Sequence, residues 1–401
     1  MQKNITNEKK MYPSAFILYL NYFIHGIGCS ILGQQVIKDM LANQWSATVA
    51  SVTMVAAALG LGRLIALPFS GPMSDKLGRR ASTLIGIGSY IIFFLGIAYS
   101  PNMTVAYIAA IVGGIANSFL DTGVIPACVE ILQPRSGLAT MLTKLFISVA
   151  QLLLPIALTY MVANNISLTY IMIFAAIVLA IVGLLLFKIP MPTNNQTNGK
   201  KTSLLEDIKT INFTKESLAL IAIGFTCTAT FQLWLNCAQE FGKASGLANP
   251  SQMQVYYSLG TVIAILATSV LVNKIKEVRF LVLYPLISLV MLVLVYLIKS
   301  PAICMIGSFV IGYSAAGGVL QLATATVNDL FPKIKGTITS VIMIASSLSN
   351  YTILSAAGKI SEANGPAAVM AMNIVITLIG VLLALLVNKN YNKLLENVVT
   401  D

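Results

Sequence analysis

The chain has 401 residues, of which 57% are hydrophobic and only 10% are charged. A soluble domain carries about a quarter charged residues, so this composition excludes an ordinary water-exposed surface and indicates an exterior that faces lipid. The formal net charge of +11 would suggest a nucleic-acid partner in a soluble chain. In a membrane protein Lys and Arg collect in cytoplasmic loops instead, so we expect the lipid bilayer as a partner and no nucleic acid.

Apolar segments of about 20 residues, the length that crosses a hydrocarbon core, recur along the chain and predict twelve transmembrane helices. In the first half they span 14–36, 48–70, 82–99, 106–131, 138–162 and 167–188. In the second half they span 217–239, 253–273, 280–298, 302–329, 337–358 and 366–388. The predicted fold is an all-α membrane protein built from two pseudo-symmetric six-helix bundles.

A polar stretch, rich in Pro, Asn, Thr and charge, separates the two halves and predicts a linker, with a short interfacial helix around Leu204–Ile211. The predicted parts are a cytoplasmic tail 1–13, a bundle 14–188, a cytoplasmic linker 189–216, a bundle 217–388 and a cytoplasmic tail 389–401.

The distribution of basic residues predicts the orientation in the membrane. With both termini placed inside, nineteen of the 25 Lys and Arg residues fall in cytoplasmic segments and four in outer segments, Lys38 among these four. Two more, Arg63 and Lys144, fall inside predicted helices. Cytoplasmic loops are enriched in basic residues, so we expect a multi-pass protein of a bacterial cytoplasmic (inner) membrane with both termini in the cytoplasm.

The two halves carry matching sequence. Residues 129–135 read VEILQPR and residues 327–333 read VNDLFPK, and these stretches, like Gly114 and Gly312, lie 198 positions apart. Parallel six-helix repeats are typical of transporters whose two halves rock about a midplane site. A shared way of ending helices at the cytoplasmic face is the alternative.

The cysteines argue against a disulfide framework or a metal site, because their number is odd, they lie in apolar segments and none forms a CxxC pair. They are Cys29, Cys128, Cys227, Cys237 and Cys304. We also find no nucleophile–base pair and no phosphate-binding loop. We therefore expect no enzyme activity and no cofactor, with a proton gradient as the energy source.

The loop between the second and third predicted helices reads GPMSDKLGRR from Gly71 to Arg80. Gly71 would let its helix pack closely against a neighbour, Asp75 would accept a hydrogen bond from a helix N-terminus or an Arg, and Gly78 would permit a tight turn. Arg79 and Arg80 are expected to face anionic lipid and the cytoplasm.

This loop resembles the signature G-x-x-x-D-x-x-G-R-[KR] of the major facilitator superfamily at every fixed position. The resemblance implies a transporter for a small-molecule substrate, monomeric by default, that works by alternating access. The loop is then expected to stabilise one conformation, and we assign Glu130, near the cytoplasmic end of the fourth helix, to the same gate.

A second resemblance concerns residues 117–126, NSFLDTGVIP, in the fourth predicted helix. They look like the fourth helix of the fucose-type sugar–proton symporters, although Ile125 stands where that branch has an Asn before the proline. In that branch the acidic residue of this helix carries the proton. By resemblance, Asp121 is the proton carrier here.

Ionisable side chains at bilayer depth cost about 2.5 kcal/mol or more and mark transport pathways by default. Asp121 lies near the middle of its helix, and we predict that it couples proton movement to substrate binding; the alternative is a structural ion pair with Arg63 or Lys144. His25 would relay protons near neutral pH, or would be a neutral histidine hydrogen-bonded between helices.

Arg63 and Lys144 outnumber the one central acid, which favours an anionic substrate such as a small carboxylate. Each of the two cations also has an alternative role that is purely structural. Lys144 can extend to the cytoplasmic interface, and Arg63 can stabilise the gate through Glu130 or Asp121.

Other polar residues on the helices that line major facilitator cavities complete the predicted substrate site. Trp234 would stack on a ring of the substrate or anchor at the membrane interface. The remaining candidates are Gln34 and Gln35 in the first helix, Asn117, Gln151, Gln232, Asn236, Gln321, Asn350 and Tyr351.

The leading prediction is a proton-coupled symporter that takes up a small polar organic solute, with the two cations favouring an anionic carboxylate. A drug–proton exporter is the first alternative, but the fifth helix lacks the Gly-rich pattern of such exporters and carries Lys144. A neutral sugar–proton symporter is the second alternative. A transporter-like receptor or membrane enzyme is the third, and no appended domain supports it.

Overall fold

A computed structural model describes residues 11–133, 136–192, 214–271, 275–331 and 335–400. The chain divides into two compact units, residues 1–198 (unit 1) and 199–401 (unit 2). Each unit is described by itself.

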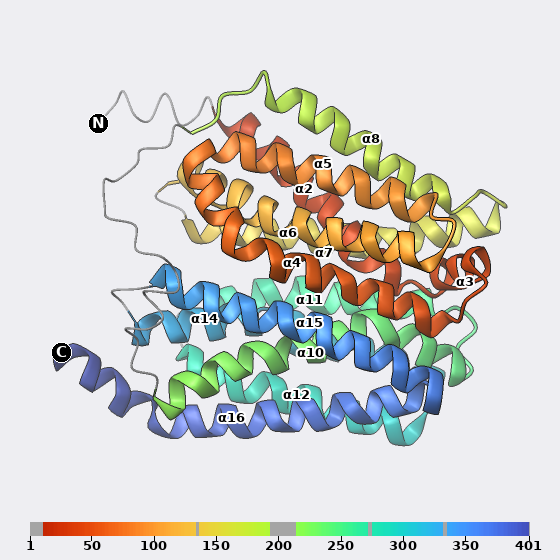
Figure 1. Cartoon of the computed structure of the whole chain (residues 1–401). Coiled ribbons are helices and arrows are strands. Elements are labelled where there is room, and N and C mark those ends of the chain that lie inside the picture. Colours follow the sequence, from red (N-terminus) through yellow and green to blue (C-terminus); the bar gives the residue numbers. More distant parts are fainter. Residues whose placement is uncertain (1–10, 134–135, 193–213, 272–274, 332–334, 401) are drawn as a thin grey trace. The chain divides into compact units, whose positions relative to one another are not determined.

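Unit 1 is a bundle in which long helices run side by side (Figure 1). Within it α4 packs on α6, α5 packs on α6 and α8, and α2 packs on α7. Its elements are α2 (Tyr12–Ser30), η1 (Ile31–Gly33), α3 (Gln35–Trp45), α4 (Val49–Leu77), α5 (Arg79–Ala98), α6 (Met103–Ile131), α7 (Ser136–Ala163) and α8 (Thr169–Leu186).

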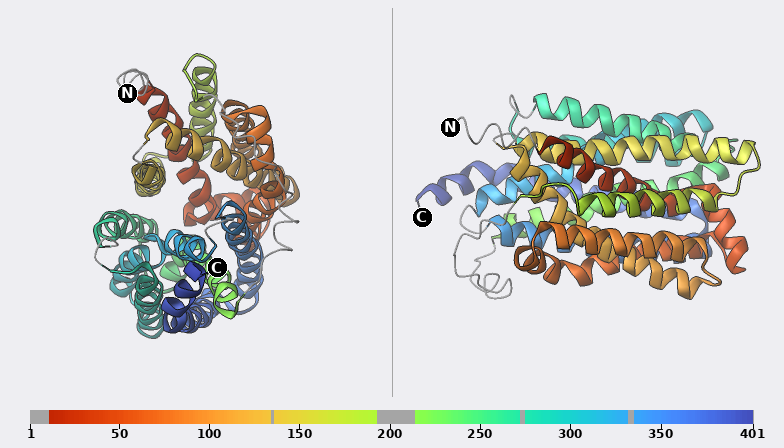
Figure 2. Two further views of the ribbon diagram at one scale, coloured as in Figure 1. Left: turned by 90° about the vertical axis from the view of Figure 1, so that its left-hand side faces the viewer. Right: turned by 90° about the horizontal axis from the view of Figure 1, so that it is seen from above.

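Unit 2 is a second bundle, in which α10 packs against α15 and α16, and α12 packs against α16. Figure 2 shows its helices end-on and from the side. Its elements are α10 (Lys215–Ala244), α11 (Ser251–Leu271), α12 (Glu277–Ile298), α13 (Pro301–Ile311), η2 (Gly312–Ala316), α14 (Val319–Leu330), α15 (Lys335–Asn364) and α16 (Pro366–Thr400).

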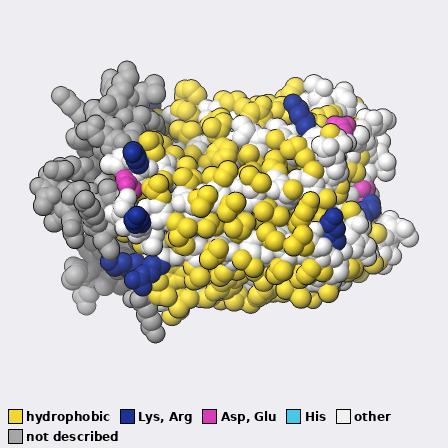
Figure 3. All heavy atoms as spheres, turned by 90° about the horizontal axis from the view of Figure 1, so that it is seen from below, with side chains coloured by type: hydrophobic (Ala, Val, Ile, Leu, Met, Phe, Trp, Pro, Cys, Tyr) yellow, Lys and Arg dark blue, Asp and Glu magenta, His cyan; other side chains and the backbone are white. Residues whose placement is uncertain are grey.

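Twelve segments of the described chain are helical, long enough and apolar enough to cross a membrane, which confirms the predicted twelve helices. Large hydrophobic side chains such as Leu184, Val270 and Leu297 are more than half exposed on them. On the face drawn in Figure 3, hydrophobic side chains cover the middle, and the coloured charged side chains lie towards the two ends. A lipid-facing exterior explains this distribution.

Side-chain caps fix where several helices begin. The hydroxyl of Thr48 accepts from the Ser51 amide at the start of α4, and the Asn102 side chain accepts from the Val105 amide at the start of α6. Thr214 plays the same part for α10. Each cap satisfies a backbone N–H that has no partner within the helix.

The first predicted helix, 14–36, is wrong at its C-terminal end. α2 stops at Ser30, a short turn follows, and Gln35 begins a separate helix, α3. Gln34 and Gln35 therefore do not continue the first helix. Lys38, predicted in an outer loop, lies in α3 with its side chain buried, and its ammonium donates to Thr53 Oγ1 over 2.7 Å.

The tenth predicted helix, 302–329, is broken in the middle. α13 leads into a π-helical turn, Gly312–Ala316, and α14 starts only after Gly318. Gly318 has φ +120°, a backbone conformation that residues with a Cβ rarely adopt. The Gly317–Gly318 pair is the visible sequence cause of this break.

The last helix is longer than predicted, because α16 continues to Thr400 through the segment predicted as a tail. The interfacial helix predicted around Leu204–Ile211 lies outside the described residues.

Glycine pairs show the repeat in three dimensions. In unit 1, a Cβ added at Gly62 would lie 1.9 Å from the Ile111 carbonyl oxygen, and one at Gly114 would lie 2.1 Å from the Leu59 carbonyl oxygen. In unit 2, Gly260 and Gly312 meet the opposing backbone in the same way, at 2.1 and 2.0 Å. Each pair member lies 198 positions from its counterpart, so α4 crosses α6 as α11 crosses η2.

Candidate functional site

An ion pair lies at the centre of unit 1. Arg63 Nη2, on α4, lies 2.7 Å from Asp121 Oδ2, on α6, and the two side chains are about a quarter exposed, at 24% and 25%. The other oxygen, Asp121 Oδ1, accepts a 2.8 Å hydrogen bond from the hydroxyl of Tyr22, a buried residue of α2. Three helices therefore meet at one carboxylate. The ion pair between Asp121 and Arg63, given above as the alternative to a coupling role, is therefore present.

The backbone contact between α4 and α6 places this pair. Gly62 and Gly114 let the two helices touch, and Arg63 follows Gly62 directly. Ser118 Oγ donates to the Arg63 carbonyl oxygen over 3.0 Å, which fixes the arginine backbone against α6. Asp121 lies three residues further along the same helix, close to one turn, and so faces Arg63.

A second polar group lies beside the pair. His25 Nδ1, on α2, lies 2.6 Å from the hydroxyl of Tyr90, on α5, and this hydroxyl also donates to Asn117 Oδ1, on α6. His25 Nε2 lies 3.2 Å from Cys29 Sγ. The Tyr22 and Tyr90 rings pack edge-on against the imidazole. His25 thus has the geometry of a histidine hydrogen-bonded between helices.

Lys144, on α7, completes the charged group. Its ammonium interacts electrostatically with Asp121 and Arg63, and it makes no hydrogen bond or ion pair with any residue that the structure describes. α7 is held against α2 because Gly26 has no side chain; a Cβ there would lie 2.5 Å from the Ile147 carbonyl oxygen. Arg63 is neutralised by Asp121, so Lys144 is a second cation without a carboxylate of its own among the described side chains.

The predicted loop 71–80 is mostly helical, because α4 runs to Leu77 and α5 begins at Arg79. This segment takes part in an ion-pair network in unit 1. Arg79 Nη1 lies 3.1 Å from Asp75 Oδ1, and Arg79 Nη2 lies 3.5 Å from Glu130 Oε1, on α6. Arg79 Nη1 also donates to Ser74 Oγ, which in turn donates to the Thr122 carbonyl oxygen. This network connects α4, α5 and α6 at their shared end.

Two expectations for this loop are wrong. Arg79 does not face lipid and water, because its side chain is only 15% exposed and is taken up by two carboxylates. Gly71 does not serve close packing within unit 1, because no described atom of that unit lies within 4 Å of a Cβ built there. The expected turn at Gly78 is confirmed by its φ of +91°. Arg80 donates to the Ile189 carbonyl oxygen over 2.8 Å and so is not simply lipid-facing.

The remaining candidates of unit 1 are spread out. Gln151 is buried on α7. Gln35 donates to Asp39 Oδ1 within α3, and Gln34 donates over 3.4 Å to the Ser30 carbonyl oxygen. Neither of these two interactions reaches the Arg63–Asp121 pair.

The candidates of unit 2 lie on three helices, α10, α14 and α15. Gln232 accepts from Asn236 within α10, Gln321 is exposed on α14, and Asn350 and Tyr351 are partly buried on α15. Both expectations for Trp234 are wrong, because the indole is 2% exposed inside an apolar cluster of unit 2. Its neighbours in that cluster include Met291 and Val295.

Unit 2 carries no copy of the charged group. Thr261, Val319 and Ile342 stand 198 positions after Arg63, Asp121 and Lys144 respectively.

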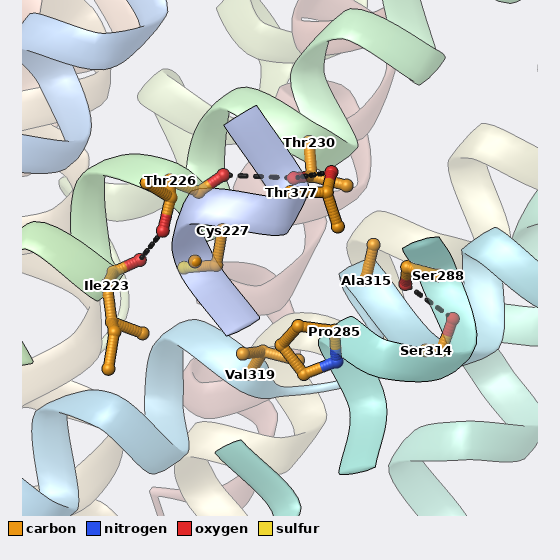
Figure 4. Close-up of a pocket in the computed structure, with 11 residues that line it drawn as sticks. Ile223, Thr226, Cys227, Thr230, Pro285, Ser288, Ser314, Ala315, Val319 and Thr377 are labelled. Atoms are coloured by element: carbon orange, nitrogen blue, oxygen red, sulfur yellow. Dashed lines mark hydrogen bonds between the residues drawn. The ribbon is translucent and has the colours of Figure 1, made fainter. Parts of the chain in front are cut away.

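A small cavity lies there instead, and Figure 4 shows its lining side chains. Ser288, the counterpart of Tyr90, contributes a hydroxyl where unit 1 has a ring. That hydroxyl bonds Ser314 over 2.6 Å, and on the opposite wall Thr230 bonds Thr377 over 2.8 Å. The hydroxyls thus satisfy one another, and no charged side chain lines this cavity.

The family follows from a match over most of the chain. A family model described as Major Facilitator Superfamily matches residues 18–351. The chain belongs to the major facilitator superfamily. It is therefore a multi-pass membrane transporter and not an enzyme.

Relatives within the superfamily match along their full length. The chain is 34% identical to the "Uncharacterized MFS-type transporter YfkL" of Bacillus subtilis (strain 168), over 94% of this chain and 96% of that protein. It is 33% identical to the "Inner membrane transport protein YdiN" of Escherichia coli (strain K12), over 89% of this chain and 86% of that protein. A solved D-xylose–proton symporter superposes with a TM-score of 0.76 over 94% of this chain and 97% of that one, at 16% identity. At that identity the likeness supports the major facilitator fold alone.

Three residues of the site were missed in the sequence: Tyr22, Cys29 and Tyr90. Tyr22 and Cys29 lie three residues before and four residues after His25 on α2, the spacing at which helical side chains share a face. That signal was available. Tyr90 gave none, because nothing in its own helix indicates that its hydroxyl reaches His25 and Asn117.

Proposed function

We propose that this protein is a secondary active transporter that takes up a small organic anion together with protons. The observation that carries the proposal is the charge balance of unit 1, where one carboxylate faces two cations at bilayer depth. Arg63 and Asp121 neutralise each other over 2.7 Å, which leaves the Lys144 ammonium to attract an anion. A buried charge needs a counter-charge, and a substrate carboxylate would supply it.

Coupling follows from competition for Arg63. A carboxylate held by Lys144 would also attract the neighbouring guanidinium and weaken its bond to Asp121. A proton bound by Asp121 would then replace the guanidinium charge, so that the carboxylate is not left as an unpaired buried charge. Substrate and proton would then favour each other's binding, as symport requires.

The network of Asp75, Arg79 and Glu130 would act as the gate. Its ion pairs connect three helix ends in unit 1, and charge pairs of this kind stabilise whichever conformation brings them together. Opening that end of the bundle would require these pairs to separate. Protonation or substrate binding at Asp121, on the same helix as Glu130, would bias that step.

The test is uptake by proteoliposomes under an imposed pH gradient, acidic outside, with a panel of labelled carboxylates and neutral sugars. We expect a carboxylate to accumulate only with the gradient. Asp121→Asn should abolish accumulation but retain exchange of substrate across the membrane, and Lys144→Met should weaken carboxylate binding. Tyr170→Phe, a change on an exposed residue of α8, is the matched control and should behave like the wild type.

Other outcomes would favour the alternatives. Uptake of a neutral sugar that is unaffected by Lys144→Met would support a sugar–proton symporter. Extrusion of lipophilic cations driven by the gradient, without carboxylate uptake, would support a drug–proton exporter. Either result would overturn the anion proposal.

A further inference from the structure

A polar stripe runs along α7 from Lys144. Lys144, Ser148 and Gln151 are spaced i, i+4 and i+7, which places them on one face of the helix. The opposite face carries exposed apolar side chains, Leu153 and Ile156 among them. The stripe therefore lies on the side of α7 that faces away from the exposed apolar side chains.

The two neutral members of the stripe are buried. Ser148 is 2% exposed and Gln151 is 7% exposed. Neither side chain makes a hydrogen bond to a residue that the structure describes, whereas most other buried hydroxyls of unit 1 donate to a carbonyl or a side chain, Ser14 and Ser70 being further exceptions. Unlike the Ser14 and Ser70 hydroxyls, the polar atoms of Ser148 and Gln151 are not among the sealed unpartnered atoms, so they remain open to a hydrogen-bonding partner from outside the chain.

The charged end of the stripe joins the site described above. The Lys144 ammonium interacts with Asp121 and Arg63, and Gln151 lies seven residues further along the same helix. At 1.5 Å rise per residue, the stripe spans about 10 Å along the helix axis. It presents one cation, one hydroxyl and one amide in line.

We infer that this stripe recognises a hydroxylated carboxylate, with the acid group at Lys144 and hydroxyl groups at Ser148 and Gln151. The inference rests on the proposed uptake of an organic anion and names its class. A hydroxyl can both donate and accept, so it satisfies the Ser148 hydroxyl and either end of the Gln151 amide. A carboxylate without hydroxyls would leave both groups unpaired and bind more weakly.

The experiment compares three six-carbon probes on the purified full-length protein: D-gluconate with acid and hydroxyls, hexanoate with the acid alone, and D-sorbitol with hydroxyls alone. Binding is measured by isothermal titration, and smaller and cyclic hydroxy acids are run beside their deoxy analogues. We expect the hydroxy acids to bind about tenfold or more tightly than the deoxy acids and the polyol.

Two variants separate the roles. Gln151→Leu, which keeps the side-chain volume, should lower hydroxy-acid affinity to the level of the deoxy acid and leave the deoxy acid unchanged. Lys144→Met should weaken both acids and spare any polyol binding. Thr159→Val, on the exposed side of α7, should change nothing.

The failures are distinguishable. Equal binding of deoxy and hydroxy acids, or an equal loss of both in Gln151→Leu, would show that the stripe does not bind hydroxyl groups of the substrate. The proposed uptake of an organic anion would still stand. If no carboxylate of either kind binds while the protein remains folded, the proposed function fails, and this inference fails with it.

Discussion

Asp121 is held by two groups of different chemistry, the Arg63 guanidinium and the Tyr22 hydroxyl. The guanidinium is a mobile cation that a substrate anion can attract. The hydroxyl belongs to a buried ring that packs edge-on against His25. We therefore propose that Tyr22 is a positioning residue, which keeps one oxygen of the carboxylate oriented if Arg63 moves.

Removing this hydroxyl should impair coupling more than substrate exchange, because one oxygen of the Asp121 carboxylate loses its hydrogen-bond donor. We expect Tyr22→Phe to keep exchange of labelled substrate near the wild-type level and to lower its gradient-driven accumulation several-fold, in line with the loss of one hydrogen bond of about 1 kcal/mol. Both are measured with the same proteoliposomes. Tyr170→Phe should leave both unchanged, and full accumulation in Tyr22→Phe would show that the hydroxyl has no part in coupling.

The charged members of the site could be selected from the sequence because an ionisable side chain in an apolar helix is costly wherever it points. That reasoning found Asp121, Arg63 and Lys144. It could not give their partners, because the contact between Arg63 and Asp121 depends on how α4 crosses α6. Tyr90 shows the same limit, since a tyrosine in a membrane helix is common and costs little.

At the scale of elements, the crossing of α4 and α6 through Gly62 and Gly114 positions Arg63. Gly114→Ala would place a methyl group 2.6 Å from the Arg63 amide nitrogen and 2.1 Å from the Leu59 carbonyl oxygen. The helices must then separate, at a cost of about 1–3 kcal/mol. We expect a lower midpoint of thermal unfolding in detergent and reduced uptake.

Gly88→Ala is the matched control for that prediction. Gly88 is an exposed helical glycine of α5 with open space around it, so alanine should keep or slightly raise the unfolding midpoint. Equal midpoints for Gly114→Ala and Gly88→Ala would contradict the close crossing.

The turn between α4 and α5 depends on the backbone of Gly78. Its φ of +91° and ψ of +160° fall in a region that is nearly exclusive to glycine, and Arg79 follows directly. We expect Gly78→Ala to cost about 1–3 kcal/mol and to impair uptake by displacing Arg79 from Asp75 and Glu130. Gly71→Ala, seven positions earlier within α4, meets open space and should be tolerated. Matching losses in both variants would argue against a special role for the turn.

Element ends were harder to predict than element existence. α3 was missed because its sequence, QVIKDMLANQW, contains two charges and reads as an outer loop by composition. Its buried face, which includes Ile37 and Leu41, packs against unit 1 and stabilises the helix by tertiary contacts. The predictions for Trp234 were wrong for a related reason. Its sequence neighbours Gln232 and Asn236 are polar, but the ring itself packs among apolar side chains.

At the scale of the whole molecule, the repeat is geometric and not chemical. The glycine crossings recur 198 positions apart, while the charged residues of unit 1 are replaced by Thr261, Val319 and Ile342. Repeated backbones with unlike side chains allow one half to carry the coupling chemistry while both halves share the same mechanics. The sequence shows both the repeat, through its helix ends, and the charge asymmetry, because Asp121, Arg63 and Lys144 all lie in the first half.

The orientation proposed from the basic residues places both termini in the cytoplasm. A fluorescent protein fused after residue 401 folds only in the cytoplasm and should therefore be bright. An alkaline phosphatase fused at the same point should be inactive. The reverse pair of results would place the C-terminus outside and invert every predicted loop.

The central claim is that Asp121 carries a proton that moves with an organic anion. The most direct measurement is the pH inside proteoliposomes, reported by a trapped fluorescent indicator. A carboxylate that the protein is known to bind is added outside, with no imposed pH gradient. We predict that the lumen acidifies with the wild-type protein and that Asp121→Asn abolishes this change while still exchanging labelled substrate. Substrate entry without any change in internal pH, or acidification that persists in Asp121→Asn, would contradict the account.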